Sequence, residues 1–263
     1  MAENLVQKVL HSPGVILLTL NDPGTRNAMS EEMAQQFAAI ARALRTDHSV
    51  RAIVLTGSGG AFSGGGHLDM LFEKMKLPAE KNREIMESFY DSFLSIRAIG
   101  VPVIAAINGH AIGAGLCLAL GCDVRVASSS AKLGLNFVHL GLHPGMGATY
   151  FLPRLVGYSR AAELLFTGAI LSAEDALRLG VVSYVTSPED VLSKATEIAT
   201  QIAQAGPHVM RQLKETLLQT EYSTLPESLA REAQCQALNY ASDEFLEGIT
   251  AAREKRKPNF QSS

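Results

Sequence analysis

Short apolar runs, separated by longer stretches of mixed polarity, set the pattern of this chain. Each run is only a few residues long, which is typical of a buried strand. The runs that predict strands lie at Val15–Leu20, Ile53–Thr56, Val103–Ile107, Val124–Ala127 and Lys132–Leu135. Because the stretches between them have helical patterns, the order of elements favours a layered α/β core.

The helical stretches begin at residues that are typical helix caps. Ser172 is a predicted N-cap of a short helix that begins with Ala-Glu-Asp. Ser30 is another, and acidic residues follow it in the first turn. The apolar face that this second pattern predicts consists of Met33, Phe37, Ile40 and Leu44.

Two regions interrupt the alternation of strands and helices. From 70 to 97 the chain is helix-like, and two interpretations stand: a mobile lid over a pocket, or a helix that covers the core. From Pro188 onward only helices are predicted, with breaks near Gly206-Pro207 and Leu225-Pro226.

The segment from Val101 to Asp123, VPVIAAINGHAIGAGLCLALGCD, is the most informative part of the sequence. An apolar strand is followed by the small-residue turn Gly113-Ala114-Gly115, which opens a predicted helix. Such a helix start leaves backbone N–H groups unpaired, and they can stabilise a negative charge that develops on oxygen. A buried strand, turn and helix without chemistry has the same pattern, so this segment alone leaves both interpretations open.

A second glycine-rich loop follows the strand at 52–56. Its sequence, GSGGAFSGGGHLDM at 57–70, lacks the GxGxxG spacing of dinucleotide sites and the GxxxxGK[ST] phosphate loop. The glycines at 64–66 instead predict a place where the backbone lies close to a ligand. Two such strand-then-glycine turns suggest two N–H groups that converge on one oxygen.

Composition narrows the class of protein. The chain has 263 residues, 47% of them hydrophobic, which suffices for one sizeable core and an appendage. Its formal net charge is −3 without a basic block for a nucleic acid, and its three cysteines form neither a disulfide framework nor a CxxC metal motif. The first ten residues lack a signal-peptide pattern, and polar residues and glycines interrupt the longest apolar run. We therefore expect a cytoplasmic protein with neither a nucleic acid nor a membrane as partner.

Six blocks of the sequence carry a family resemblance. They are LNDPGTRNAMS at 20–30, AFSGGGHLDM at 61–70, PVIAAINGHAIGAGLCLALGCD at 102–123, AKLGLNFVHLGLHPGMGATYFLPRLVG at 131–157, TGAILSAEDALRLGVV at 167–182 and EGITAAREKRKPNF at 247–260. In this order they resemble the crotonase (enoyl-CoA hydratase/isomerase) superfamily. The resemblance implies an α/β fold with a spiral of ββα units. It also implies an acyl-CoA-binding core over 1–195 and a helical oligomerisation region over 196–263, in a homotrimer or a dimer of trimers.

The resemblance also implies a ligand and a set of site residues. The ligand is an acyl-CoA thioester, so coenzyme A is part of the substrate and neither a cofactor nor a metal is expected. The two amides of an oxyanion hole match Gly66 and Ala114. The other substrate-binding positions that the resemblance implies are Arg26, Ala28, Gly64, His67, Leu68, Asp69, Cys117, Phe137, Lys257 and Phe260.

The last two of these positions lie in the basic C-terminal stretch REKRKPNF. The resemblance places that stretch against the nucleotide part of coenzyme A on an adjacent subunit, where phosphates call for cations. A solvated basic end is the other interpretation.

The sequence departs from the family at the residues that transfer protons. Cys117 and Phe137 match the two glutamates of the hydratases, and Gly145 matches an aspartate of other members. A positioned proton-transfer group contributes about 10²–10⁴-fold to a rate. Phenylalanine cannot transfer a proton, and a thiol buried in an apolar helix is a poor acid or base at neutral pH. We therefore interpret Cys117 as a small core residue and Phe137 as a wall of the acyl pocket.

Histidines are the candidates to replace the missing carboxylates, because their charge changes near neutral pH. The candidates are His67, His139 and His143, together with Asp69 next to His67 in the sequence. His143 is favoured because it lies in the loop that lines the acyl site in relatives. For each of them a surface or structural role is the other interpretation. Asp123 is expected to cap or pair inside the protein.

Three functions are compatible with these residues. The leading one is an enoyl-CoA hydratase or isomerase of fatty-acid or related acyl-CoA breakdown. The second uses the same oxyanion hole for decarboxylation, hydrolysis or C–C cleavage of a malonyl-type or β-dicarbonyl thioester, which depends more on enolate stabilisation than on two glutamates. The third is an acyl-CoA-binding protein without activity, against which the two glycine-rich elements argue.

Overall fold

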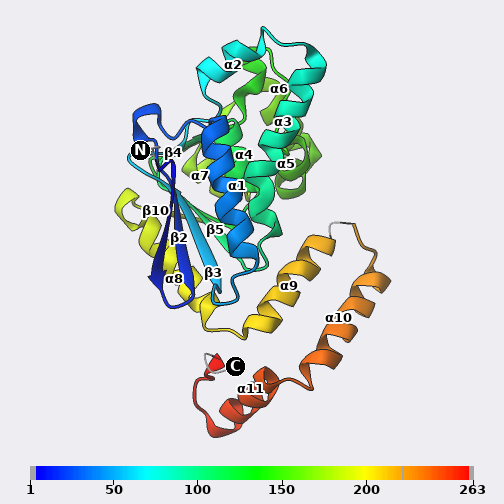
Figure 1. The fold of residues 1–263 in the computed structure, drawn as a ribbon. Helices are drawn as coiled ribbons and strands as arrows, with labels where there is room; N and C mark the ends of the chain where they lie inside the picture. Colours follow the sequence, from blue (N-terminus) through cyan, green and yellow to red (C-terminus); the bar gives the residue numbers. More distant parts are fainter. Residues whose placement is uncertain (1–3, 221, 261–263) are drawn as a thin grey trace.

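A mostly parallel sheet forms the centre of the molecule (Figure 1). The computed structural model describes residues 4–220 and 222–260. Within them the strand order of this sheet is β1-β2-β3-β5-β7-β10, and β1 is antiparallel to β2 while the other neighbours are parallel. The strands are β1 (Val6–Ser12), β2 (Val15–Leu20), β3 (Ala52–Gly57), β5 (Val103–Ile107), β7 (Val124–Ser128) and β10 (Tyr184–Thr186).

A second, smaller sheet has the order β4-β6-β8-β9. Its strands are β4 (Ala61–Ser63), β6 (His110–Ile112), β8 (Lys132–Gly134) and β9 (Ile170–Ser172). The strands β4, β6 and β8 each begin shortly after β3, β5 and β7 end. The chain therefore passes from the large sheet to the small one at the same edge in successive units.

Helices follow these strand pairs and cover the large sheet. The α-helices are α1 (Glu31–Arg45), α2 (Leu68–Lys74), α3 (Ala79–Leu94), α4 (Ala114–Leu120), α5 (Ala148–Val156), α6 (Tyr158–Thr167), α7 (Ala173–Arg178), α8 (Val191–Ala203), α9 (Pro207–Thr220), α10 (Leu225–Asn239) and α11 (Asp243–Glu254). The 3₁₀ helices are η1 (Pro23–Thr25), η2 (Ser95–Ala98), η3 (Asn136–Leu140) and η4 (Pro188–Asp190). The successions β3-β4-α2, β5-β6-α4 and β7-β8-η3 repeat one pattern, which confirms the predicted spiral of ββα units.

The two faces of the large sheet are covered by different helices. Successive side chains of a strand point to opposite faces. In β3, Ile53 and Leu55 join the larger apolar core with residues of α1, α3 and α4, whereas Val54 packs with Ala195 and Ala199 of α8. Because both faces are buried, β3 and β5 are continuous apolar runs, which is why they could be predicted from the sequence.

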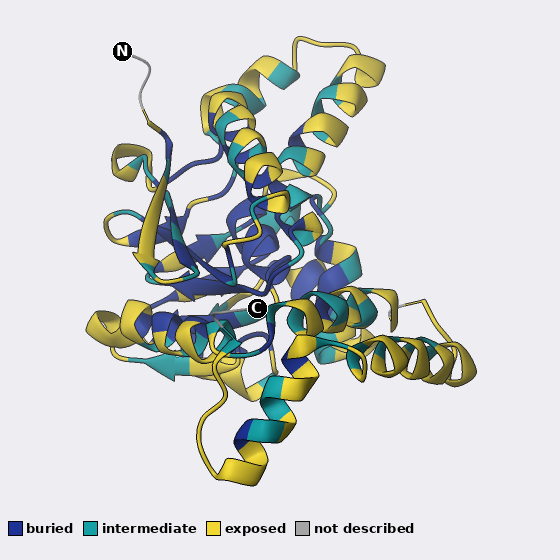
Figure 2. Cartoon of the chain, turned by 60° about the horizontal axis from the view of Figure 1, so that its bottom comes forward, coloured by how far each residue is buried: buried dark blue, intermediate teal, exposed yellow. Residues whose placement is uncertain are grey.

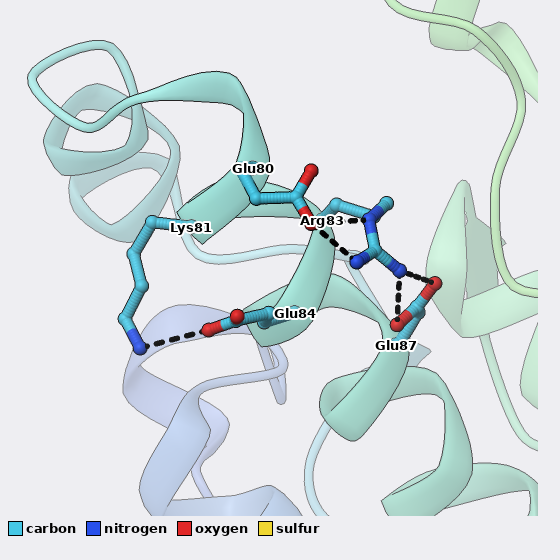
Figure 3. Close-up of polar contacts among 5 residues, drawn as sticks. All are labelled: Glu80, Lys81, Arg83, Glu84 and Glu87. Atoms are coloured by element: carbon cyan, nitrogen blue, oxygen red, sulfur yellow. Dashed lines mark hydrogen bonds and ion pairs between the residues drawn. The ribbon is translucent and has the colours of Figure 1, made fainter.

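α3 covers the core with one face and exposes the other. Phe89 and Phe93 are buried near its C-terminal end. On the exposed face, Arg83 pairs with Glu80 and Glu87, one helical turn away on either side (Figure 3). Such exposed pairs contribute little to stability because water screens them, so the buried aromatic residues fix the helix. α2 buries no residue, and its role as a lid stays a prediction.

The helices α9, α10 and α11 leave the core together (Figure 1). Most of their residues are exposed or half-buried (Figure 2), and α10 buries none. α9 and α10 carry exposed leucines along their length, among them Leu213, Leu217, Leu225, Leu229 and Leu238. The predicted boundary at residues 195 and 196 falls inside α8, and the division into two parts stays a prediction.

Most of the predicted elements of the core are present. The strand predicted at Val15–Leu20 has these bounds as β2, and Ser30 Oγ accepts a hydrogen bond from Met33 N at 3.1 Å, as expected for an N-cap. Ser172 Oγ caps α7 in the same way. The pattern does not predict β1, because only Val6 of this strand is buried. None of the helices in the described part of the chain is long and apolar enough to cross a membrane.

Candidate active site

A short parallel bridge holds Gly66 beside the loop that follows β2. Met29 N donates to Gly65 O at 2.7 Å, and His67 N donates to Met29 O at 3.2 Å. Met29 thus pairs with the residues on both sides of Gly66. In such a bridge the central residue of the partner segment directs its own N–H to the opposite side. The Gly66 amide therefore points away from Met29.

Gly65 brings this loop against the start of α4. Its φ of +92° is a conformation that favours glycine. A Cβ at this position would lie 2.6 Å from Ile112 O and 3.5 Å from Ala114 N. The loop and the helix start are consequently in backbone contact, and the segments that carry the Gly66 and Ala114 amides meet here.

The start of α4 presents its amides at this junction. Cys117 N makes the first helical hydrogen bond, to Gly113 O at 3.1 Å, so the Ala114 amide lies outside the helical pattern. A Cβ on Gly115 would lie 2.5 Å from Ser63 O, so the small residue lets α4 approach β4. The helix dipole adds partial positive charge at this end. These features suit an oxygen that becomes negatively charged.

Asn27 ties the loops around the junction together. It is fully buried with φ +54°; its Oδ1 accepts from Asp22 N at 2.9 Å, and its Nδ2 donates to Ala61 O at 2.9 Å. Ser63 Oγ donates to Asn27 O at 2.7 Å and accepts from Gly65 N at 3.2 Å. Sequence reasoning missed this role, and the available signal was an asparagine in a tight turn, where it tolerates left-handed backbone.

The positions that match family carboxylates hold other groups. Cys117 is fully buried, and its Sγ donates to Gly145 O at 3.4 Å. Burial raises the pKa of the Cys117 thiol far above its usual value, so the thiol is neutral. The ring of half-buried Phe137 lies 3.8 Å from the Cβ position of Gly113. A neutral thiol and an aromatic ring therefore flank the first turn of α4.

The candidate histidines lie in three different surroundings. His67 precedes α2, and its Nδ1 lies 3.9 Å from Asp69 Oδ2. His139 is exposed, with Nε2 2.9 Å from Thr167 O at the end of α6, which is a structural contact. His143 is exposed, with Nδ1 2.8 Å from Pro144 O. Catalytic roles for these histidines stay predictions. In the described residues no group of three His, Cys, Asp or Glu side chains could hold a metal ion.

Other predicted binding residues gather around the same loops. Gly64 N donates to Arg26 O at 2.9 Å, so the exposed Arg26 lies directly beside the glycine-rich loop. Ala28 is buried between them and the bridge. Leu68 and Asp69 begin α2 and are exposed. The structure thus brings these five positions to the neighbourhood of Gly66, and their contacts with a substrate stay predictions.

Lys257 and Phe260 lie elsewhere in the chain. Arg51 Nη2 donates to Phe260 O at 2.9 Å, and Arg51 precedes β3. The loop that carries Gly66 follows β3 at the opposite end of that strand. Within one chain the structure therefore does not join Lys257 and Phe260 to Gly66, and their contact with a substrate on an adjacent subunit stays a prediction.

One cation of the C-terminal stretch is already paired. Arg256 Nη1 lies 2.6 Å from Glu247 Oε1, and Arg256 also contacts Glu254. Hydrogen bonds from Arg256 and from the amide of Asn259 lower the pKa of Glu247 to about 2. Arg256 therefore holds the stretch that follows α11 against that helix, whereas Lys257 is exposed.

Known proteins resemble this chain over nearly its whole length. A model of the enoyl-CoA hydratase/isomerase family matches residues 11–263. The chain belongs to this family. The 2,3-dehydroadipyl-CoA hydratase of Escherichia coli is 36% identical over 247 residues, which cover 94% of this chain and 95% of that protein. The crotonyl-CoA hydratase of Syntrophomonas wolfei is also 36% identical, over 94% of each chain.

Solved structures of the family share the fold. An enoyl-CoA hydratase from Bacillus anthracis superposes with a TM-score of 0.93 at 33% identity, over 98% of this chain and 100% of that one. The structure of an enoyl-CoA hydratase from Polaromonas gives a TM-score of 0.92, also at 33% identity. The predicted crotonase-type fold is thereby confirmed.

In this member of the family, sequence reasoning also missed a contact between Tyr90 and Gly145. The side chain lies on α3, in the region that was predicted only as a lid or a cover. A Cβ on Gly145 would lie 2.2 Å from Tyr90 Oη. No sequence signal pointed to this residue, because the contact joins segments that are 55 positions apart.

Proposed function

We propose that this hydratase/isomerase family member acts on acyl-CoA thioesters and stabilises a thioester enolate with the amides of Gly66 and Ala114. The observation that carries the proposal is the backbone contact of Gly65 with the start of α4. This contact supports the proposal, because it joins the segment that carries the Gly66 amide to the helix start that carries the Ala114 amide. Two such donors aimed at one oxygen form an oxyanion hole, and removal of one typically costs about 10²–10³-fold in rate.

The substrate class is supported by the names of relatives. These include a crotonyl-CoA hydratase and a 2,3-dehydroadipyl-CoA hydratase, both of which act on α,β-unsaturated thioesters by name. We therefore place this enzyme in fatty-acid or related acyl-CoA breakdown, with coenzyme A as part of the substrate and no further cofactor. Arg26 and, from an adjacent subunit, Lys257 are the cations for its phosphates.

Assembly into a homotrimer or a dimer of trimers belongs to the same proposal. The exposed leucines of α9 and α10 would leave a large apolar surface in water if the chain were a monomer. A helix such as α10, which buries no residue of its own, suits contacts with another copy. Cytoplasmic location also stays part of the proposal.

A second reaction is favoured by the groups next to the junction. Cys117, Phe137 and Gly145 offer no carboxylate, and burial keeps the thiol neutral. Hydration of an enoyl thioester needs a base for the water and an acid for the α-carbon. Decarboxylation or C–C cleavage of a malonyl-type or β-dicarbonyl thioester mainly needs the enolate to be stabilised. The same oxyanion hole supports both reactions.

A double substitution separates the two reactions. We expect Cys117→Glu with Phe137→Glu to raise the hydration rate of crotonyl-CoA at least about 10²-fold over the natural protein, because it supplies two proton-transfer groups. The measurement is the loss of the enoyl-thioester ultraviolet absorbance, with a melting curve to show that each variant is folded. The control is Cys117→Ser with Phe137→Leu, which adds no carboxylate. Rapid hydration by the natural protein that the double variant does not exceed would contradict the expectation and retain the hydratase assignment.

A further inference from the structure

A cavity of about 410 Å³ lies between α9 and the core. Its walls are mostly apolar and come from α5, α8 and α9, with Phe151, Ile202 and Leu217 among them. The described residues that line it include none from the glycine-rich loop at 57–70 and none from the first turn of α4. This α9 cavity is therefore separate from the candidate active site, and its volume suits a small organic ligand.

Arg125 of β7 brings a buried cation to the α9 cavity. The residue lines the cavity and is only 7% exposed. Its Nε donates to Val181 O at 2.7 Å, and its Nη1 donates to Cys122 O at 2.7 Å. Within the described part of the chain, Nη2 has no acceptor and no carboxylate lies within ion-pair distance of the guanidinium. Nη2 is also not sealed off by other protein atoms, so a ligand in the cavity can reach it.

A buried guanidinium without an anion is an unfavourable arrangement. Removal of a charge from water is costly, and proteins offset that cost with an opposite charge. Burial lowers the pKa of Arg125, yet a guanidinium keeps its proton at neutral pH. The carboxylate of Asp123, two residues earlier, pairs with Lys214 Nζ at 2.9 Å. Arg125 therefore retains a charge and unused N–H groups that an anion in the cavity would satisfy.

The α9 cavity is positively charged overall. Its described lining residues include three arginines and one lysine, whereas Asp123 is the single acidic residue among them. The guanidinium of Arg97 lies 4.9 Å from the ring centroid of Phe151. That of Arg154 lies 3.6 Å from the ring centroid of Tyr150. Apolar walls together with guanidinium groups fit a molecule that has an apolar body and an anionic end.

We propose that the α9 cavity is a second ligand site, which binds a carboxylate with an apolar body and pairs the carboxylate with Arg125. A carboxylate is planar and accepts N–H bonds from the planar guanidinium at both of its oxygens. The apolar body of the ligand lies against the side chains of α5 and α9. Because α9 forms one wall, the bound ligand also holds this helix to the core and stabilises the folded chain.

Isothermal titration calorimetry with decanoate tests the site. We expect the natural protein to bind decanoate at least about 10-fold more tightly than decanol, which has the same apolar body without the charge. Arg125→Met keeps a long apolar side chain and should weaken decanoate binding by about 10- to 100-fold, without changing the Kd of decanol. Arg42→Met removes an exposed guanidinium on α1, outside the cavity, and should leave both Kd values unchanged.

A second variant fills the α9 cavity and leaves its cations in place. Leu217→Trp enlarges a side chain of α9 that lines the cavity. We expect it to weaken decanoate binding at least about 10-fold although Arg125 is present, because the apolar body of the ligand loses its space. Melting curves show that each variant is folded, and decanoate should raise the melting temperature of the natural protein only.

Other results would overturn the inference and leave the proposed function intact. Equal binding of decanol and decanoate would show that apolar surface alone takes the ligand. Loss of decanoate binding in Gly65→Ala, or its displacement by free coenzyme A, would show that decanoate occupies the acyl site. A natural protein that binds no decanoate also contradicts the proposal. If Arg125→Met but not Arg42→Met then dissociates an oligomer in light scattering, an acidic group of a second copy fills the cavity instead.

Discussion

Gly65→Ala is expected to lower the turnover of an acyl-CoA substrate by about 10²–10³-fold, the effect of losing one donor of an oxyanion hole. The added methyl group would lie 2.6 Å from Ile112 O, and the residue has a φ of +92°. To relieve this clash, the loop that carries Gly65 would have to move away from β6. That movement would separate Gly66 from Ala114. The measurement is kcat/KM for the thioester that the natural protein turns over.

The matched control is an alanine at another glycine of the same glycine-rich segment, on the other side of β4. Gly60 has no atom within 4 Å of its Cβ position and no positive φ, so Gly60→Ala should keep the natural kcat/KM. Melting curves separate loss of the site from loss of the fold. A folded Gly65→Ala variant with natural turnover would show that the contact between this loop and α4 does not hold the catalytic donors.

Asp123→Ala is expected to lower the free energy of unfolding by about 3 kcal/mol, because it leaves a buried cation without its partner. Lys214 of α9 is only 5% exposed, and its Nζ lies 2.9 Å from Asp123 Oδ2 and 2.8 Å from Val101 O. Asp123 Oδ2 also accepts from Val103 N at 2.7 Å. The pair fastens α9 to the core. It is an internal pairing of Asp123, one of the two roles predicted for this residue. Chemical denaturation measures the effect.

Removal of both charges of the Asp123–Lys214 pair should lower the free energy of unfolding less than removal of the Asp123 charge alone. Asp123→Ala with Lys214→Met eliminates the unpaired cation, so the double variant should regain part of the lost stability. Asp91→Ala on the exposed surface of α3 is the control and should change stability by less than about 0.5 kcal/mol. A double variant that loses the sum of both single effects would contradict the view that the unpaired charge is the cause.

The sequence predicts those elements that are buried on one face or on both faces, because their pattern of apolar residues is visible within one short segment. β2 and β3 are apolar runs because they lie inside the large sheet, and Ser30 caps α1 through a bond three residues away. β1 lies at the edge of the sheet with most of its residues partly or fully exposed, so its pattern carries little signal. The spiral of ββα units came from the family resemblance, and the order of strands across the sheet was not predicted, since pairing joins distant segments.

The same division applies to the site. The two strand-then-glycine turns could be predicted, because small residues after a strand are a local signal. That the amides of Gly66 and Ala114 form the oxyanion hole is what the family resemblance implies. The role of Asn27 and the contact of Tyr90 with Gly145 could not be predicted, because both join segments that are far apart in the chain. The separation of Phe260 from the glycine-rich loop is likewise a property of the folded chain. Phe260 contacts Arg51, which precedes β3, whereas the loop follows β3 at the other end of the strand.

Infrared difference spectroscopy of bound crotonyl-CoA, with carbon-13 at the thioester carbonyl, tests the central claim most directly. Donors at Gly66 and Ala114 withdraw electron density from the C=O bond and weaken it, whichever reaction follows. We predict that the carbonyl stretch of the bound thioester lies at a lower frequency than in water, and that Gly65→Ala removes most of this shift. A thioester that binds with its carbonyl frequency unchanged would contradict the account.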